Sequence, residues 1–256
     1  MKIRVLGAHN SESRSTRSMT LLVDDVLALD AGGLTSSLSF EEQFRLKAVL
    51  ITHAHYDHLR DIPALAMNLF LREKQVDIWS HQAVFDALNE HFLNGAVYPA
   101  FHHRPESKPT LYFQLIEPGQ GVQIAGFGVK ALPVIHSVPA LGYQVTSPQN
   151  RSLFYSGDSG VGLDQVWDRI DPSVLFIETT APNRWETSML EHKHLTPSLL
   201  RRELAVLKSL KGTLPRIVIV HMNPDAESEI ADQIRLVGQE LDADISLAAE
   251  GLELIV

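Results

Sequence analysis

The stretch that decides the fold runs from residue 48 to residue 58 and reads AVLITHAHYDH. It opens with four apolar residues, a run that predicts a short, fully buried strand. The run leads into three histidines and an aspartate, namely His53, His55, Asp57 and His58. Imidazoles at this density repel one another when protonated, whereas neutral imidazoles offer lone pairs to a metal cation. The stretch therefore predicts a strand followed by a metal-binding loop.

Other polar residues come after apolar runs in the same way. In sheet proteins, the ends of strands bring together side chains that are distant in sequence. A solvated histidine-rich loop with unrelated histidines downstream is the alternative, but the repetition of the pattern at successive strand ends favours a site. The residues placed in this way are His53, His136, Asp158, Glu178 and His221.

Two metal ions need more ligands than the 48–58 stretch supplies, and the later strand ends provide them. A carboxylate can bridge two cations, so Asp158 is expected to be shared. Each ion keeps one position open for water, as a catalytic metal requires. We predict His53, His55 and His136 as ligands of one ion, Asp57, His58 and His221 as ligands of the other, and Asp158 as the bridge.

Short apolar runs alternate with amphipathic segments along the chain, which predicts a mixed α/β (α+β) protein. One helix is expected from His58 onward, with Pro63 in its early turns, and another from Pro197 behind an N-capping Thr196. A third helix is expected over residues 227–240. Strands are expected at residues 2–6, 20–23, 26–29, 48–51, 76–79, 111–116, 129–135, 142–146, 152–155, 174–177, 216–220, 245–247 and 252–255.

The composition limits the class of protein. A chain of 256 residues with 45% hydrophobic content can bury a full core, as one large domain or as two tightly fused halves. The formal net charge is −9 and no long run of Lys and Arg occurs, so binding to long nucleic acid is disfavoured. A small anionic substrate stays open, because bound cations set the local field whatever the net charge.

The sequence has no cysteine, which excludes disulfides and thiolate metal ligands. Residues 1–6 contain only a short apolar segment and no signal-peptide core. No apolar run reaches the roughly 20 residues that span a bilayer. A soluble, cytoplasmic protein without a membrane partner is therefore the expectation.

The segment Thr52–His58, taken with His136, Gly157-Asp158 and His221, resembles the metallo-β-lactamase-fold hydrolase superfamily. The likeness covers essentially the whole chain. It implies a four-layer αββα sandwich, formed by residues 1–256 as a single domain of two similar halves. It also implies two divalent metal ions at the edge where the two sheets meet, with zinc expected and manganese or iron as alternatives.

Within that superfamily, three stretches look most like the class II cyclic-nucleotide phosphodiesterases. The resemblance implies cleavage of a 3′,5′-cyclic nucleotide, cAMP or cGMP, and a homodimer. Two departures leave the substrate open: Asn223 stands where a lysine is frequent, and Ala8-His9-Asn10 replaces a glycine run. The stretches are Leu6-Gly7 with the serine-rich loop 11–18 and residues 27–32, residues 178–180 with 192–197, and residues 221–224.

Hydrolysis of a phosphodiester needs a nucleophile, neutralisation of charge, and a proton for the leaving alkoxide. A hydroxide between two cations supplies the first, because metal binding lowers the pKa of water from about 15.7 towards 7. His194 is the expected general acid and Glu178 the carboxylate that orients it, while Asp57 counts as both ligand and catalytic residue. The alternatives are a loop or capping histidine and a fold-stabilising carboxylate. Asp30 is either an acceptor that fixes a ligand histidine or a turn residue.

The remaining histidines and one long segment carry weaker signals. Residues 92–109 include aromatic side chains and Arg104, and they form either a substrate loop or a surface loop with an apolar underside. His192 is expected to be exposed. The residues expected at the surface or lining a pocket are His81, His91, His102 and His103.

Three other functions compete with the phosphodiesterase. A ribonuclease Z-like RNA 3′-end endonuclease shares the motif layout, but it needs a tRNA-docking arm and a basic surface, neither of which the sequence shows. A lactonase or other small-ester hydrolase of the same fold has less use for His194 as a leaving-group acid. A metal-binding protein without turnover is disfavoured by the nearly complete ligand set with an open metal position.

Overall fold

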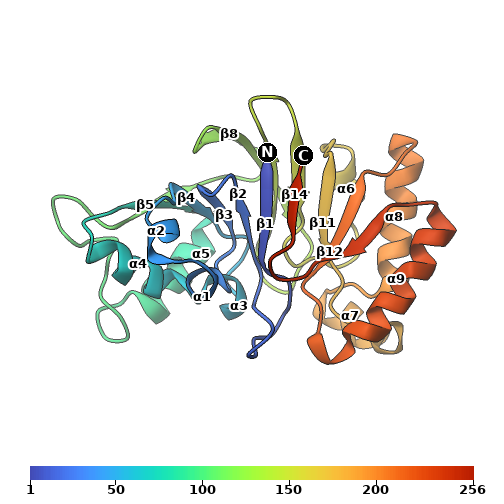
Figure 1. The fold of residues 1–256 in the computed structure, drawn as a ribbon, viewed down its shortest axis with the longest axis horizontal. Helices are drawn as coiled ribbons and strands as arrows, with labels where there is room; N and C mark the ends of the chain where they lie inside the picture. Colours follow the sequence, from blue (N-terminus) through green and yellow to red (C-terminus); the bar gives the residue numbers. More distant parts are fainter.

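The computed structural model describes residues 1–256 as two seven-stranded sheets packed face to face, with helices on the outer face of each (Figure 1). This is the four-layer αββα arrangement that the resemblance to metallo-β-lactamase-fold hydrolases implied. Helices α1–α5 cover the first sheet, and helices α6–α9 cover the second (Figure 1).

The first sheet is mostly built from the first half of the chain. Its first three strand pairs are antiparallel and its last three are parallel. In spatial order the strands are β14 (Glu253–Ile255), β1 (Lys2–Gly7), β2 (Thr20–Val23), β3 (Leu27–Leu29), β4 (Ala48–Leu50), β5 (Val76–Ser80) and β6 (Leu111–Leu115).

The second sheet repeats this succession of three antiparallel and three parallel pairs. On the strength of this repetition, we propose to describe the chain as one domain of two similar halves. In spatial order the strands are β7 (Gly121–Ile124), β8 (Phe127–Val134), β9 (Ala140–Thr146), β10 (Ser152–Tyr155), β11 (Val174–Glu178), β12 (Arg216–Val220) and β13 (Ile245–Leu247).

The helices are short except for two in the second half. Those over the first sheet are α1 (Leu34–Ser37), α2 (Phe40–Gln43), α3 (Tyr56–Leu59), α4 (Ile62–Phe70) and α5 (Gln82–Ala87), which continues into a π-helical turn at Leu88–Phe92. Those over the second sheet are α6 (Asp164–Trp167), α7 (Glu186–His192), α8 (Pro197–Lys211) and α9 (Glu227–Leu241), and 3₁₀ turns lie at Asn183–Trp185 and Pro224–Ala226. None of these helices combines the length and the apolar composition that a membrane-spanning segment requires.

Three apolar cores separate the four layers, because alternate residues of a strand face opposite sides of its sheet. In β4, Leu50 joins the core between the sheets, whereas Val49 joins the core under the helices of the first half. In β10, Leu153 lies between the sheets and Phe154 lies under the helices of the second half. Strands buried on both faces explain the continuous apolar runs that mark the sequence.

The structure corrects several element predictions. The helix expected from His58 onward is two helices, because the backbone at the break pairs with Ala31: Ala31 N–H donates to the His58 carbonyl, and Asp61 N–H donates to the Ala31 carbonyl. Strand β8 ends at Val134, so Ile135 lies outside it and is 49% exposed. Strand β7 and helices α1, α2, α5, α6 and α7 were not predicted.

Candidate metal centre

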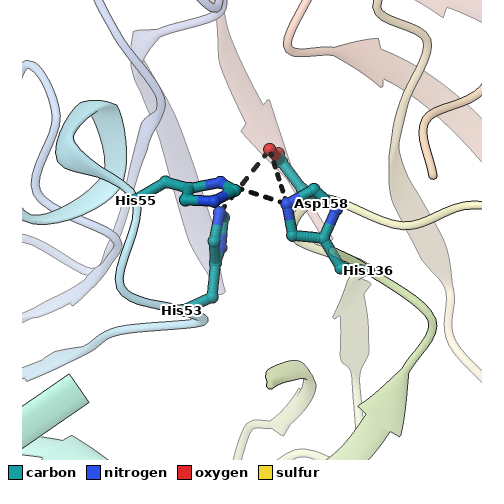
Figure 2. A group of neighbouring side chains, drawn as sticks. All are labelled: His53, His55, His136 and Asp158. Atoms are coloured by element: carbon teal, nitrogen blue, oxygen red, sulfur yellow. Dashed lines mark hydrogen bonds and ion pairs between the residues drawn. The ribbon is translucent and has the colours of Figure 1, made fainter. Parts of the chain in front are cut away.

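The predicted ligands meet at one edge of the sandwich, where strands from both sheets end. Strands β10, β11 and β12 are parallel, so their carboxyl ends share this edge. Figure 2 shows the imidazoles of His53 and His55, from the first half, facing His136 and Asp158, from the second. Residues more than 80 positions apart in sequence are thereby in contact, since His136 Nε2 lies 3.1 Å from His55 Nδ1.

The first ligand group comprises His53, His55, His136 and Asp158, whose ligand atoms all lie within 4.8 Å of one another. Oδ2 of Asp158 lies 3.6 Å from Nε2 of His53 and 3.8 Å from Nε2 of His136. Three imidazoles around one carboxylate oxygen match the donor set of a borderline divalent cation.

The second ligand group comprises Asp57, His58 and His221. Nε2 of His221 lies 3.1 Å from Oδ2 of Asp57, and Nε2 of His58 lies 3.6 Å from the same oxygen. The other oxygen of Asp158, Oδ1, lies 3.1 Å from His58 Nε2 and 3.3 Å from His221 Nε2. Asp158 therefore presents one oxygen to each group, which is the geometry of a bridging carboxylate.

The turn that carries Asp158 depends on a glycine. Gly157 has φ +59°, and a Cβ built there would lie 2.9 Å from the side chain of Thr52. Any larger residue would strain the backbone and collide with Thr52 at once. The Gly-Asp pair thus lets the second sheet approach the strand end that bears His53.

Three buried atoms in the cluster lack a hydrogen-bond partner: His53 Nε2, His58 Nε2 and Asp158 Oδ1. His58 Nδ1 lies 2.7 Å from Asp30 and carries the proton of that contact, so in the neutral ring Nε2 directs a lone pair at the Asp158 oxygen 3.1 Å away. Two facing lone pairs in a buried site are unfavourable unless a cation or a proton lies between them. The residues present therefore fit bound metal.

The pKa values of the cluster reflect the same crowding of charge. Burial lowers the pKa of His53, and the neighbouring His58 lowers it further. Burial also opposes protonation of His58, but the carboxylates of Asp158, Asp57 and Asp30 outweigh it and hold the pKa of His58 well above 6.5. Burial raises the pKa of Asp57, but His58 and His221 bring it down to about 2. Burial likewise opposes ionisation of Asp158, yet His221 and His58 keep its pKa well below 3.8. The carboxylates are thus ionised and need positive charge beside them.

Asp30, just after β3, holds the histidines of the first half and is fully buried. Its Oδ2 accepts hydrogen bonds from His58 Nδ1 at 2.7 Å, from Thr52 Oγ1 at 2.9 Å and from the Tyr155 hydroxyl at 2.7 Å. Thr52 Oγ1 in turn lies 2.9 Å from His53 Nδ1. Both histidines therefore keep Nε2 free for metal, so Asp30 is an orienting acceptor and not merely a turn residue. We call these five residues the Asp30 network.

Glu178, the last residue of β11, plays the same part in the second half and is also fully buried. Its Oε2 accepts from Thr180 Oγ1 at 2.8 Å, and that hydroxyl lies 2.9 Å from His221 Nδ1. Its Oε1 lies 2.7 Å from His194 Nδ1. Its carboxylate also accepts from the backbone N–H groups of Ser159, Thr180 and Leu195. We call Glu178, Thr180, His194 and His221 the Glu178 network.

His194 lies beside both ligand groups, in the segment between α7 and α8. Its ring centroid is 5.0 Å from that of His136 and 5.5 Å from that of His221, and its side chain is 16% exposed. Burial lowers the pKa of His194, but the charge and hydrogen bond of Glu178 raise it more strongly, to about 9. His194 is therefore protonated at neutral pH, as a general acid must be. One of its ring nitrogens also lies within 4.8 Å of ligand atoms of Asp158 and His221, so the geometry allows a metal-ligand role as well.

The sequence model of a protein family described as "Beta-lactamase superfamily domain" matches residues 22–222. This chain belongs to the beta-lactamase superfamily. The family match confirms the resemblance to metallo-β-lactamase-fold hydrolases, whose fold this chain shares.

Curated relatives of this superfamily member match only part of its length. Ribonuclease Z of Pyrococcus abyssi is 27% identical over 157 residues, which cover 58% of this chain and 48% of that protein. Ribonuclease Z of Pyrococcus horikoshii is 31% identical over 115 residues, which cover 43% of this chain and 34% of that protein. The matched region thus spans half or less of these relatives.

Solved structures of the superfamily match over the whole length. Unliganded yeast PDE1 superimposes with a TM-score of 0.86 at 17% identity, covering 100% of this chain and 99% of that one. The metallo-β-lactamase-fold protein YhfI of Bacillus subtilis gives 0.79 at 16% identity, with 99% and 98% covered. The short form of human tRNase Z gives 0.69 at 19% identity, with 100% and 99% covered. At these identities the likeness establishes the fold.

Some predicted residues lie elsewhere than the site. His192, His91 and His103 are exposed, as expected for surface histidines. Phe101, in the 92–109 segment, is only 1% exposed and packs in the core of the first half, so it is not available to a substrate. Arg104 is exposed, and the role of this segment in binding substrate stays a prediction.

Sequence reasoning missed the residues that hold the ligands in place. Thr52 and Thr180 each stand between a buried carboxylate and a ligand histidine, and Lys193 contacts His136. A signal was present for the two threonines, because one directly precedes His53 and the other lies two residues after Glu178. No sequence signal links Lys193 or Tyr155 to its partner.

Proposed function

We propose that this superfamily member is a phosphodiesterase that cleaves 3′,5′-cyclic nucleotides, cAMP or cGMP, at a centre of two divalent cations. The observation that carries this proposal is the His194–Glu178 pair beside the two ligand groups. Cleavage of a phosphodiester expels an alkoxide that needs a proton, and a protonated imidazole at this position is suited to supply it.

We propose His53, His55 and His136 as ligands of one cation, Asp57, His58 and His221 as ligands of the other, and Asp158 as the bridge. The support is the division of the two Asp158 oxygens between the groups. Two bound cations would supply a water of lowered pKa and would stabilise charge on the phosphoryl oxygens. Zinc is the proposed metal because it favours imidazole and carboxylate ligands, although manganese and iron accept the same donors.

The residues around the cations have separate tasks. Glu178 holds His194 through Nδ1, so the proton available to the leaving group is the one on Nε2. After proton transfer, the same hydrogen bond keeps the neutral ring in the Nδ1–H tautomer, ready to be protonated again from water. Asp57 stays ionised, since its pKa is about 2, and it contributes negative charge to the second group.

A ribonuclease Z-like RNA 3′-end endonuclease is the second candidate, favoured by the names of the two Pyrococcus relatives. The net charge of −9 counts against a long RNA partner, because phosphate contacts need basic side chains. A lactonase or other small-ester hydrolase is the third candidate. A homodimer, implied by the motif resemblance, stays a prediction that sedimentation velocity can test.

A substrate panel tests the proposal. The purified, metal-loaded protein is assayed against 3′,5′-cAMP, 3′,5′-cGMP, bis-p-nitrophenyl phosphate, a pre-tRNA and a set of lactones, with Asp158→Asn as the inactive control. We expect turnover of a cyclic nucleotide to exceed that of the pre-tRNA and the lactones. Turnover confined to pre-tRNA would favour the endonuclease, and turnover confined to lactones would rule out the phosphodiesterase.

A further inference from the structure

His136 is oriented differently from the four histidines that the Asp30 and Glu178 networks hold. It has no buried carboxylate behind it, and its Nδ1 lies 3.2 Å from the backbone carbonyl oxygen of Lys193, to which it can donate. The ammonium group of Lys193 donates back to the carbonyl oxygen of His136 at 3.0 Å. Two hydrogen bonds thus close a ring between residues 57 positions apart in sequence.

Lys193 occupies a backbone conformation that lysine does not favour. It follows the last residue of α7 with φ 58° and ψ 52°, in the left-handed region. Glycine adopts this conformation freely, whereas any residue with a Cβ is strained there. In this conformation the ammonium group of Lys193 reaches the carbonyl oxygen of His136 and donates to it.

Lys193 also contacts the loop that follows Asp158. A Cβ built on Gly160 would lie 3.0 Å from Cα of Lys193, so the two backbones are closely packed. The N–H of Gly160 donates to the carbonyl of Ile135 at 2.7 Å. The segments that carry His136 and Asp158 therefore meet at Lys193, and the next residue along the chain is His194.

We propose that Lys193 is a positioning residue, because its two hydrogen bonds hold His136 against the turn that carries His194. The carbonyl of Lys193 keeps the proton of His136 on Nδ1 and leaves Nε2 free for the cation of the first ligand group. The ammonium group holds the same two segments together from the other side. This inference rests on the proposed function, because it assigns His136 to a metal and His194 to proton transfer.

Metal titration of the apoprotein tests this positioning role of Lys193 without any substrate. Zinc is added in competition with a chromophoric chelator to the unaltered protein and to Lys193→Met, which removes the ammonium group but keeps most of the stem. Lys193→Gly removes the side chain and relieves the backbone, and Lys193→Arg restores a cationic donor. Asp242→Gly is the matched control, because Asp242 follows α9 in the same left-handed conformation, with φ 47°, and is not part of the centre.

We expect Lys193→Met and Lys193→Gly to weaken one zinc equivalent by about 10–100-fold, the range for losing a partner that orients a ligand, and to leave the other unchanged. Lys193→Arg and Asp242→Gly should bind both equivalents as the unaltered protein does. Unchanged zinc affinity in Lys193→Met would overturn the proposal. An equal weakening of both equivalents with a lower unfolding temperature of the apoprotein would overturn it too, because that is the signature of general destabilisation.

The two proposals fail in different ways. If the unaltered protein binds two zinc equivalents but turns over no cyclic nucleotide, the proposed function is wrong, while the titration still decides whether Lys193 holds His136. If cyclic nucleotides are hydrolysed but Lys193→Met binds zinc normally, the positioning role proposed for Lys193 is wrong and the proposed function is unaffected.

Discussion

Each half of the sandwich has one buried carboxylate that orients histidines of the candidate metal centre, and these two carboxylates hold histidines in the same way. Asp30 reaches His53 through the hydroxyl of Thr52 and holds His58 directly. In both contacts the histidine forms its hydrogen bond through Nδ1, so that Nε2 faces the ligand groups. The Asp30 network thus orients two ligands at once.

The Glu178 network repeats this plan with different members. Glu178 reaches His221 through the hydroxyl of Thr180 and holds His194 directly. By its place in the network, His194 is the counterpart of His58. The two halves therefore present equivalent histidines to the same centre.

The difference lies in access. His58 is fully buried among the carboxylates of Asp30, Asp57 and Asp158. The side chain of His194 is 16% exposed and forms a hydrogen bond with one carboxylate, that of Glu178. A buried histidine surrounded by negative charge is suited to hold a cation, and a partly exposed one can exchange protons with solvent or substrate. One scaffold can thus yield a ligand in one half and an acid in the other.

The largest effect is expected from Asp158→Asn, which removes the negative charge shared by both ligand groups. Turnover should fall by more than the roughly 10²–10³-fold typical of losing a single transition-state contact. Elemental analysis should find fewer than the about two ions expected per chain. A protein that keeps one ion at unchanged affinity would contradict the bridging assignment.

The substitution His194→Gln tests whether His194 acts as an acid whereas its counterpart His58 acts as a ligand. Turnover of a substrate with an alkoxide leaving group should fall by about 10²–10⁴-fold, and turnover of a p-nitrophenyl ester much less, because p-nitrophenolate needs no proton. Metal content should stay unchanged, whereas the parallel His58→Gln should lose metal. Loss of metal from His194→Gln would show that His194 is a ligand like its counterpart.

The pH dependence of kcat/KM tests the carboxylate behind His194. An acid catalyst works in its protonated form, so activity should fall as pH rises through the His194 pKa, which is about 9. Glu178 raises that pKa, so Glu178→Gln should move the alkaline limb to lower pH. Asp30→Asn is the counterpart and should weaken metal affinity by about 10–100-fold without moving the limb. A limb that stays in place in Glu178→Gln would argue against the assignment.

The smallest effect is expected at His9, a histidine held by carboxylates outside the ligand groups. Its Nδ1 lies 2.7 Å from Glu250 and its Nε2 lies 3.3 Å from Glu227. Burial lowers the pKa of His9, but Glu250 and Glu227 raise it above 6.5 overall. Burial raises the pKa of Glu250, but His9 and the N–H of Arg17 bring it below 4.5 overall.

These shifts fix the sign of the pH effect at His9. The raised histidine pKa stabilises the fold fully below pH 6.5 and less as pH rises through the folded value. The lowered Glu250 pKa stabilises it above pH 4.5 and less as pH falls through the folded value. His9→Gln should therefore lower the free energy of unfolding most between pH 4.5 and 6.5, by about 1.5–3 kcal/mol as measured by urea unfolding. A cost that is the same at pH 9 would show that charge is not involved.

The strands and the grouping of the candidate ligands could be predicted from the sequence because both leave local marks, whereas the αββα arrangement was implied by the family resemblance. Buried strands appear as apolar runs, and a functional residue at a strand end follows such a run directly, as His221 follows β12. The orienting residues leave no such mark, because their contacts depend on how the two sheets pack. Tyr155 and Asp30 are 125 positions apart, and neither neighbourhood reveals the other. The break between α3 and α4 was missed for the same reason, since Ala31 sets it from another segment.

The Asp30 network also constrains how this chain can change over time. Asp30 receives donors from Thr52 and His58 of its own half and from Tyr155 of the second sheet. Replacing the carboxylate alone leaves buried donors of three residues without an acceptor, and replacing any donor alone leaves a buried charge with too few hydrogen bonds. Among relatives, these positions should therefore be inherited as a set: a lineage that loses the acid at position 30 should also have replaced its threonine and its tyrosine.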